Sequence, residues 1–382
     1  MRLPEAWSRR RLLSGACAAA ASGPTLLRPL PAAAQASSDR MSIWSRPIQG
    51  FNIGTLRGSR HDADFFANVA ATGARLTRLF LQWNWEPEQA RYALASDALP
   101  ALRAALAHAR RNGLSVVLVG DFETEPNPPL WGHAGRATSF VKAWQALARE
   151  LRDDPTVVGL DLLNEPNPPW GRGNAATALA DWRALAERAV RAIRSVDAGV
   201  PIVFEGNGGG QAIGLRGLQP LADAQVVYSL HVYMPHAITH QRVSPRWPHR
   251  IPYPVSDDAL LRGTDAHPGP WDARRLRQEL VDAVEFQQRS GATLFVGEFS
   301  CVRWAPGDSA LSYIRDCVEL FQAQRWSWTY HEFRGWPGWD AEVASNRGPV
   351  DEHARSPGGG RSSDAPVMQL LRRQFALQRA GG

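Results

Sequence analysis

Two glutamates directly follow apolar segments of this 382-residue chain. Glu165 follows VVGLDLLN (157–164), and Glu298 follows TLFVG (293–297). Short apolar runs of this length are typical of buried strands. Two carboxyl groups about 5 to 5.5 Å apart can cleave a glycosidic bond with retention, because one attacks the anomeric carbon while the other protonates the departing oxygen. For either glutamate alone, the alternative is an ion pair with a loop arginine.

The segments that must position these glutamates alternate between short apolar runs and longer helical patterns, which is typical of repeated βα units. The pattern predicts eight strands, at 47–54, 74–81, 114–120, 156–164, 200–206, 225–233, 292–299 and 325–333. Eight strands with intervening helices predict an α/β protein with a single (β/α)8 TIM barrel. A doubly wound open sheet is the alternative, but GTLRGSR (54–60) lacks the glycine-rich phosphate-binding pattern.

Polar residues gather at the predicted strand ends, where the active sites of such barrels lie. They are Arg78, Asp121, Glu123, Asn164, Glu165, Glu205, His231, Tyr233, Glu298 and the residues from Trp328 to Glu332. The fourth and seventh strands lie opposite each other in a barrel, so we expect Glu165 and Glu298 to face each other over a substrate. We interpret Glu205 as structural or as a distal sugar contact.

Two tripeptides at these strand ends resemble the signatures of glycoside hydrolase family 5. They are Asn164-Glu165-Pro166 and Gly297-Glu298-Phe299, and His231-Val232-Tyr233 lies between them. The resemblance covers about residues 46 to 340. It implies that Glu165 is the general acid/base, which would need a raised pKa. It also implies that Glu298 is the nucleophile, kept ionised by Arg78.

The resemblance assigns three further roles. Asn164 would hydrogen-bond the sugar 2-hydroxyl, Tyr233 would hydrogen-bond the nucleophile, and His231 would orient the acid/base. Two positions depart from the family pattern. The histidine usual on the third strand is missing from VVLVGDFETE (116–125), and His331 replaces the usual tryptophan of the eighth strand. Trp328, Trp336 and Trp339 are the alternative sugar platforms there.

The chain has 15 tryptophans, and aromatic faces can stack on sugar rings. Trp170 and Trp304, just beyond the catalytic tips, are the strongest candidates, although tryptophans also pack between barrel and helices. His231, His236 and His240 suggest a metal site, but no carboxylate or cysteine completes an obvious ligand set. We therefore expect no metal and no cofactor.

The first 36 residues resemble an export signal. Arginines at positions 9 to 11 precede an Ala-rich apolar stretch, and Ala34-Gln35-Ala36 offers a cleavage site. The paired arginines predict a twin-arginine signal and a periplasmic or secreted protein. A disordered tail or a transit peptide is the alternative. The segment carries five arginines and one glutamate, so its removal lowers the formal charge from +6 to +2, which does not favour nucleic acid as a partner.

The remaining residues, 37–382, predict one catalytic domain and a monomer, with a low-order stretch near 345–364. No hydrophobic run is long enough to span a membrane. Cys301 and Cys317 could equally form a disulfide or remain buried thiols. The expected partner is an oligosaccharide, a polysaccharide or a glycolipid. The favoured function is a secreted retaining β-glycosidase acting on a glucan, a mannan or a related glycoconjugate, and the alternative is a non-catalytic carbohydrate-binding barrel.

Overall fold

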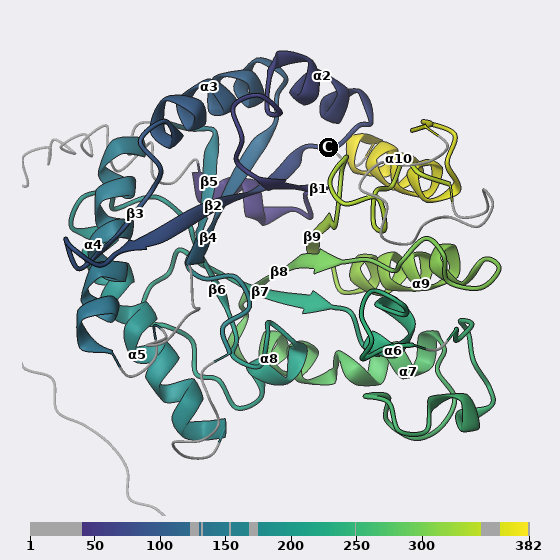
Figure 1. The fold of residues 1–382 in the computed structure, drawn as a ribbon. Coiled ribbons are helices and arrows are strands. Elements are labelled where there is room, and N and C mark those ends of the chain that lie inside the picture. Colours follow the sequence, from purple (N-terminus) through teal and green to yellow (C-terminus); the bar gives the residue numbers. More distant parts are fainter. Residues whose placement is uncertain are drawn as a thin grey trace, which may run out of the picture.

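Eight parallel strands form a closed barrel in the described part of this computed structural model (Figure 1). The structure describes residues 40–122, 130, 133–152, 154–167, 175–248, 250–344 and 360–380. The barrel strands are β1 (Gln49–Thr55), β2 (Leu76–Glu86), β4 (Ser115–Phe122), β5 (Val157–Asp161), β6 (Ile202–Glu205), β7 (Val226–Val232), β8 (Thr293–Phe299) and β9 (Ser327–Tyr330). The predicted barrel is confirmed.

Helices surround the barrel (Figure 1). The longer ones are α2 (Ala63–Ala71), α3 (Ala98–Arg111), α4 (Ala134–Leu151), α5 (Ala175–Arg194), α7 (Ala273–Glu279), α8 (Val281–Ser290), α9 (Ser309–Ala323) and α10 (Pro366–Ala380). Local signals set their ends: Asp62 caps α2 by accepting from the Phe65 backbone N–H, and α8 stops at Gly291, whose φ is +68°. None of the helices in the described ranges has the length and apolar character that a membrane crossing requires.

Short elements complete the described structure. The 3-10 helices are η1 (Ile43–Ser45), η3 (Ala212–Leu215) and η4 (Asp258–Leu261). The segment between β7 and α7 contains η4 and the one-turn helix α6 (His236–Thr239). The ninth strand, β3 (Arg91–Ala93), pairs antiparallel with the extended end of β2. Trp83 lies in β2 and is stacked on Phe122.

The barrel interior is closed at one end by an apolar layer. Trp44 packs against side chains from six strands: Leu76, Val117, Val158, Val203, Val227 and Phe295. Its indole N–H donates to the carbonyl oxygen of Val158 over 2.8 Å. Residues two apart on a strand share a face. Arg78 and Glu205 follow Leu76 and Val203 by two positions, so they form the next, polar layer of the interior.

Candidate active site

Arg78 lies at the centre of the polar layer with its side chain fully buried. A guanidinium has five N–H donors, and five acceptors surround this one. Nε donates to Asp161 (3.0 Å), Nη1 to Asn52 (3.1 Å) and Glu298 (2.6 Å), and Nη2 to Glu205 (2.7 Å) and Asn164 (3.1 Å). These contacts join β1, β2, β5, β6 and β8, so Arg78 fixes the relative positions of the strand ends.

Glu298 ends β8 with a side chain that is only 7% exposed. Oε1 accepts from Arg78, and Oε2 accepts from the Tyr233 hydroxyl over 2.8 Å. His331 Nδ1 lies 3.5 Å from Oε2. Burial alone would raise the pKa of Glu298, but the nearby His231, His331 and Arg78 together hold that pKa well below its usual range. The carboxyl group is therefore ionised, as a nucleophile requires.

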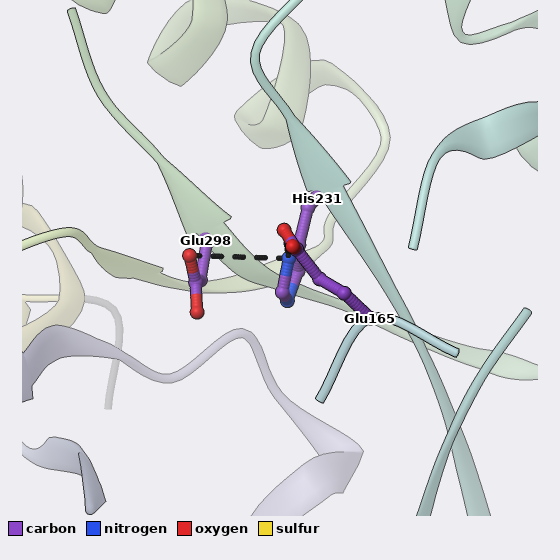
Figure 2. Close-up of side chains that lie close together, drawn as sticks. All are labelled: Glu165, His231 and Glu298. Carbon is purple, nitrogen blue, oxygen red and sulfur yellow. Dashed lines mark hydrogen bonds and ion pairs between the residues drawn. The ribbon is translucent and has the colours of Figure 1, made fainter. Parts of the chain in front are cut away.

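Glu165 follows β5 and approaches Glu298 from the opposite side of the mouth. Its side chain is 41% exposed, and Oε1 lies 2.8 Å from His231 Nδ1. Ligand atoms of Glu165, His231 and Glu298 all lie within 4.8 Å of one another, and Figure 2 shows the Glu165 side chain beside the His231 ring, which faces Glu298. One carboxyl group is thus open to solvent and the other is held in a buried network.

His231 has a carboxylate near each ring nitrogen. Nδ1 contacts Glu165, and Nε2 lies 3.3 Å from Glu205 Oε1. Burial lowers the pKa of His231, but Glu205, Glu298 and the contact with Glu165 raise it well above its ordinary value. His231 is therefore a cation at neutral pH.

Asp161 is the third carboxyl group around Arg78 and is fully buried. Burial raises its pKa to about 8, although Arg78 opposes the shift. Its Oδ1 atom is buried without a hydrogen-bond partner among the described residues, and such burial disfavours the ionised form. Arg78 and His231 are the cations that face the carboxylates of Glu205 and Glu298 in this buried layer.

Four residues predicted from sequence lie around the two glutamates. Arg78, His231 and Tyr233 contact Glu298 or Glu165 directly. Asn164 accepts from Arg78 through Oδ1, so its NH2 group is the part that remains for a substrate. Their proposed contacts with sugar remain predictions.

His331 also lies at the site, beside Glu298. Trp339 is partly buried, and its ring is 5.2 Å from that of His331 and 6.1 Å from that of Tyr233, centroid to centroid. Trp339 thus places an aromatic ring beside the position where the family usually has tryptophan.

Two other tryptophans correct our expectations. Trp328 has no exposed surface, and its ring packs against Phe299 and stacks on Phe375 of α10. It faces the helices, because the neighbouring Thr329 faces the interior and donates to the Gly297 carbonyl oxygen. Trp304 is 7% exposed, and its indole N–H donates to the Gln241 carbonyl oxygen. Both are packing residues, while Trp170 lies outside the described residues.

Sequence reasoning missed several functional groups. Glu205 was interpreted as structural or distal, yet it contacts Arg78, His231 and the Glu165 backbone. Asp161 and Asn52 were not singled out, although both hold Arg78. The period-2 alternation could have identified Glu205, because it lies two positions after the inward-facing Val203.

Asp121 ends β4 on the same side of the barrel as Glu298. Asp121 is partly exposed. Its backbone pairs with Gln82 of β2, but its side chain has no hydrogen-bond or ion-pair partner among the described residues. Burial and the charge of Glu298 raise its pKa. VVLVGDFETE contains three acidic residues. The structure describes Asp121, whereas Glu123 and Glu125 lie outside the described residues.

Glu165, His231 and Glu298 form the one group of potential metal ligands within the described ranges. A cation there would lie close to Arg78 and to a protonated His231, which disfavours metal binding electrostatically. Of the other histidines in our metal hypothesis, His236 contacts Asp265 over 2.7 Å, and burial lowers the pKa of His240 to about 3. Cys301 and Cys317, whose state was open, are both free and buried.

Comparisons with known proteins agree on one family. Residues 39–335 match the sequence profile described as Cellulase (glycosyl hydrolase family 5). Endoglucanase C of Acetivibrio thermocellus is 23% identical over 217 residues, which is 53% of this chain and 60% of that protein. An endoglucanase of Paenibacillus polymyxa is 38% identical over 112 residues, covering 25% of this chain and 28% of the relative. The matches thus span less than two thirds of these relatives.

Solved structures share the fold. A glycoside hydrolase structure is 21% identical, with a TM-score of 0.68, covering 86% of this chain and 99% of the other. Endoglucanase Cel5A of Thermotoga maritima is 20% identical, with a TM-score of 0.65, covering 88% and 99% respectively. At these identities the likeness concerns the fold alone.

Proposed function

We propose, because this chain belongs to glycoside hydrolase family 5, that it is a retaining hydrolase of O-glycosidic bonds in a β-linked glucan, mannan or related glycoconjugate. The observation that carries this proposal is the arrangement of Glu165 and Glu298. Their nearest ligand atoms lie within 4.8 Å. Retaining enzymes hold their two carboxyl groups about 5 to 5.5 Å apart, whereas inverting enzymes leave about 6.5 to 9.5 Å for a water molecule.

The first displacement uses the two glutamates together. An Oε atom of Glu298 attacks the anomeric carbon, the bond from that carbon to the leaving oxygen breaks, and Glu165 gives its proton to that oxygen. In the second displacement Glu165 takes a proton from water as the water oxygen attacks the anomeric carbon, and the ester bond to Glu298 breaks. The enzyme ends as it began, with Glu298 ionised and one proton on the contact between Glu165 and His231.

The surrounding contacts suit these roles. Arg78 and Tyr233 keep Glu298 ionised and fix its two oxygens. The exposed side chain of Glu165 can reach both leaving group and water. Asn164 directly precedes Glu165, and its Oδ1 accepts from Arg78, so its NH2 group is free to bind the hydroxyl next to the reacting carbon, a contact that strengthens in the transition state.

The substrate class follows from the relatives. The curated relatives are named endoglucanases, and Thermotoga maritima Cel5A has been solved with cellobiose and with mannotriose. A β-linked glucan or mannan is therefore the first candidate, with a glycolipid as the related glycoconjugate. His331 stands where the family usually has tryptophan, and the third strand lacks the usual histidine, so both positions should affect which sugar binds best.

Export is part of the proposal. Residues 1–36, proposed as a twin-arginine-like signal, lie outside the described residues, and residues 37–382 would be the exported domain. A periplasmic or secreted location suits an enzyme whose substrates are polysaccharides. Fractionation of cells that express the full chain, compared with a chain in which Arg9 and Arg10 are lysines, tests this location.

The experiment for the activity is a hydrolysis screen of residues 37–382. The substrates are aryl β-glucoside, β-mannoside and β-xyloside, glucan and mannan oligosaccharides, and a glycolipid, with Glu298→Gln as the control. We expect hydrolysis of one class, lost by at least about a thousandfold in the variant, and a product whose anomeric configuration is retained. A folded wild-type protein that binds these sugars without hydrolysing them would instead support the non-catalytic barrel.

A further inference from the structure

We propose that Glu205 is a positioning residue that couples the acid/base Glu165 to the nucleophile Glu298 by holding His231, Arg78 and the Glu165 backbone at once. The proposal rests on the function proposed above. It assigns a role in the reaction to a residue that lies on neither catalytic strand.

Three contacts place Glu205 between the two catalytic groups. Its Oε1 accepts from Arg78 over 2.7 Å and lies 3.3 Å from His231 Nε2. Its Oε2 accepts from the backbone N–H of Glu165 over 3.0 Å. Arg78 in turn donates to Glu298, and His231 contacts the Glu165 carboxylate. A single buried carboxylate thus contacts the partners of both catalytic glutamates.

The backbone around Glu205 is built for this contact. Glu165 has a φ of +48°, in the left-handed region that costs a residue other than glycine conformational energy. The Glu205 Oε2 contact holds the Glu165 N–H in that conformation. Gly210 makes room on the other side: a Cβ atom there would lie 2.8 Å from Oε2 and 3.2 Å from the His231 ring, and Gly210 has a φ of +71°.

The charge of Glu205 matters as much as its shape. The groups that face His231 are Glu165 after β5, Asp161 on β5, Glu205 on β6, Tyr233 beyond β7, Glu298 on β8 and Arg78 on β2. Burial raises the pKa of Asp161, which weakens its attraction for a cation, and Arg78 repels one, so the other carboxylates must keep His231 charged. Glu205 is the first of the charges that raise the pKa of His231.

A charged His231 keeps a proton on the Glu165–His231 pair. The pair can place that proton on either residue across the 2.8 Å contact, and Glu165 must give one to the leaving oxygen. In the first displacement the pair gives this proton to the leaving oxygen, and in the second it takes a proton back from water. Glu298 carries no charge while it is an ester, whereas Glu205 is unchanged. Glu205 therefore favours the return of the proton to the pair at neutral pH.

The test compares three variants of residues 37–382. Glu205→Gln removes the charge, and Glu205→Asp keeps the charge but shortens the side chain. Glu342→Gln is the matched control, because it removes the charge of another glutamate that is paired with an arginine, Glu342 with the partly exposed Arg334 at 2.6 Å, and Glu342 does not contact His231. The readouts are the pH dependence of kcat/KM and the rates on two aryl glycosides with good and poor leaving groups.

We expect the basic limb of Glu205→Gln to move to lower pH by about one unit, because losing a negative charge lowers the pKa of His231. The loss in kcat should be about tenfold larger for the poor leaving group, because protonation matters more there. Glu205→Asp should have a lower kcat but a basic limb at the same pH as the wild-type protein. Glu342→Gln should keep both the wild-type kcat and the wild-type basic limb. If the basic limb of the pH profile does not move in Glu205→Gln, and kcat falls equally on both substrates, then Glu205 has only a structural role.

A second measurement covers the case in which Glu205→Gln does not fold. NMR titration of 15N-labelled histidine in the wild-type protein, with the His231 signal assigned by its absence in His231→Gln, should show His231 protonated at pH 7. A neutral ring at pH 7 would overturn the proposal. This titration needs no substrate, so an inactive wild-type protein would refute the proposed function without deciding the role of Glu205.

Discussion

Oε2 of Glu298 accepts a hydrogen bond from the Tyr233 hydroxyl over 2.8 Å while Oε1 accepts from Arg78 over 2.6 Å. Both oxygens of this buried carboxyl group are thus bound by donors that favour its ionised form. The same contacts fix the rotation of the carboxylate, so that the lone pair needed for attack has one direction. Ionisation and orientation of Glu298 therefore have a common cause.

The acidic limb of the pH profile should depend on Tyr233. Protonation of Glu298 abolishes attack, and its lowered pKa means that wild-type activity should persist below about pH 4, the ordinary range for glutamate. Tyr233→Phe removes one donor to the ionised form, so the acidic limb should move up by about one pH unit. The measurement is kcat/KM against pH on an activated aryl glycoside.

Tyr253→Phe is a matched control for this prediction. Tyr253 also donates to a carboxylate, Asp316, over 2.7 Å, but it does not touch Glu298. Its removal should leave the acidic limb unchanged. An acidic limb that stays in place in Tyr233→Phe would mean that another group sets the acid side of the profile.

Glu165→Ala should affect substrates with poor leaving groups far more than substrates with activated ones. Loss of the proton donor should slow hydrolysis of substrates with poor leaving groups by about 10²- to 10⁴-fold. Activated aryl glycosides leave without protonation, so their first displacement should be nearly preserved and the ester on Glu298 should accumulate. A burst of aryl alcohol followed by a slow steady rate is the expected signal. Equal losses on both kinds of substrate would contradict the role of Glu165.

The predicted barrel and the positions of the two glutamates followed from sequence because both depend on local patterns. Apolar runs define the strands, and a strand end defines the mouth. Arg78 reached Glu298 as expected for the same reason. Side-chain direction at the last strand was harder: Trp328 and Thr329 alternate, and only the packing of α10 through Phe375 identifies which of the two faces outward.

The Glu205 contacts could not be predicted from local patterns. Its Oε2 acceptor role depends on the left-handed backbone at Glu165, and its close approach to His231 depends on Gly210. Both are features of loops that follow different strands. Similarly, the raised pKa of Asp161 depends on its burial and on how many carboxylates share Arg78, which sequence spacing does not reveal.

Asp121→Asn should increase stability and reduce activity. Burial and the charge of Glu298 raise the pKa of Asp121 in the folded state, so its ionisation destabilises the fold as pH rises through the ordinary aspartate range, about pH 4. The isosteric amide removes that cost at neutral pH. We expect the midpoint of thermal unfolding to rise by about 1 to 2 °C at pH 7, with a smaller change at pH 3.

The same substitution should raise KM if Asp121 accepts hydrogen bonds from sugar hydroxyls at the mouth, because an amide offers one acceptor where the carboxylate offers two. Calorimetric unfolding at the two pH values and steady-state kinetics check both parts. An equal change in unfolding temperature at pH 3 and pH 7 would show that the charge of Asp121 does not limit stability.

Trp328 and Trp339 should respond in opposite ways to truncation. Trp328 is fully buried between the barrel and α10, so Trp328→Ala should cost about 3 to 5 kcal/mol of unfolding free energy while leaving KM unchanged. Trp339 is partly buried and lies beside His331 and Tyr233, so Trp339→Ala should raise KM, with a smaller loss of stability. Denaturant unfolding and kinetics on the same preparations distinguish the two. A raised KM in Trp328→Ala, at a temperature where the variant is folded, would show that Trp328 contributes to substrate binding.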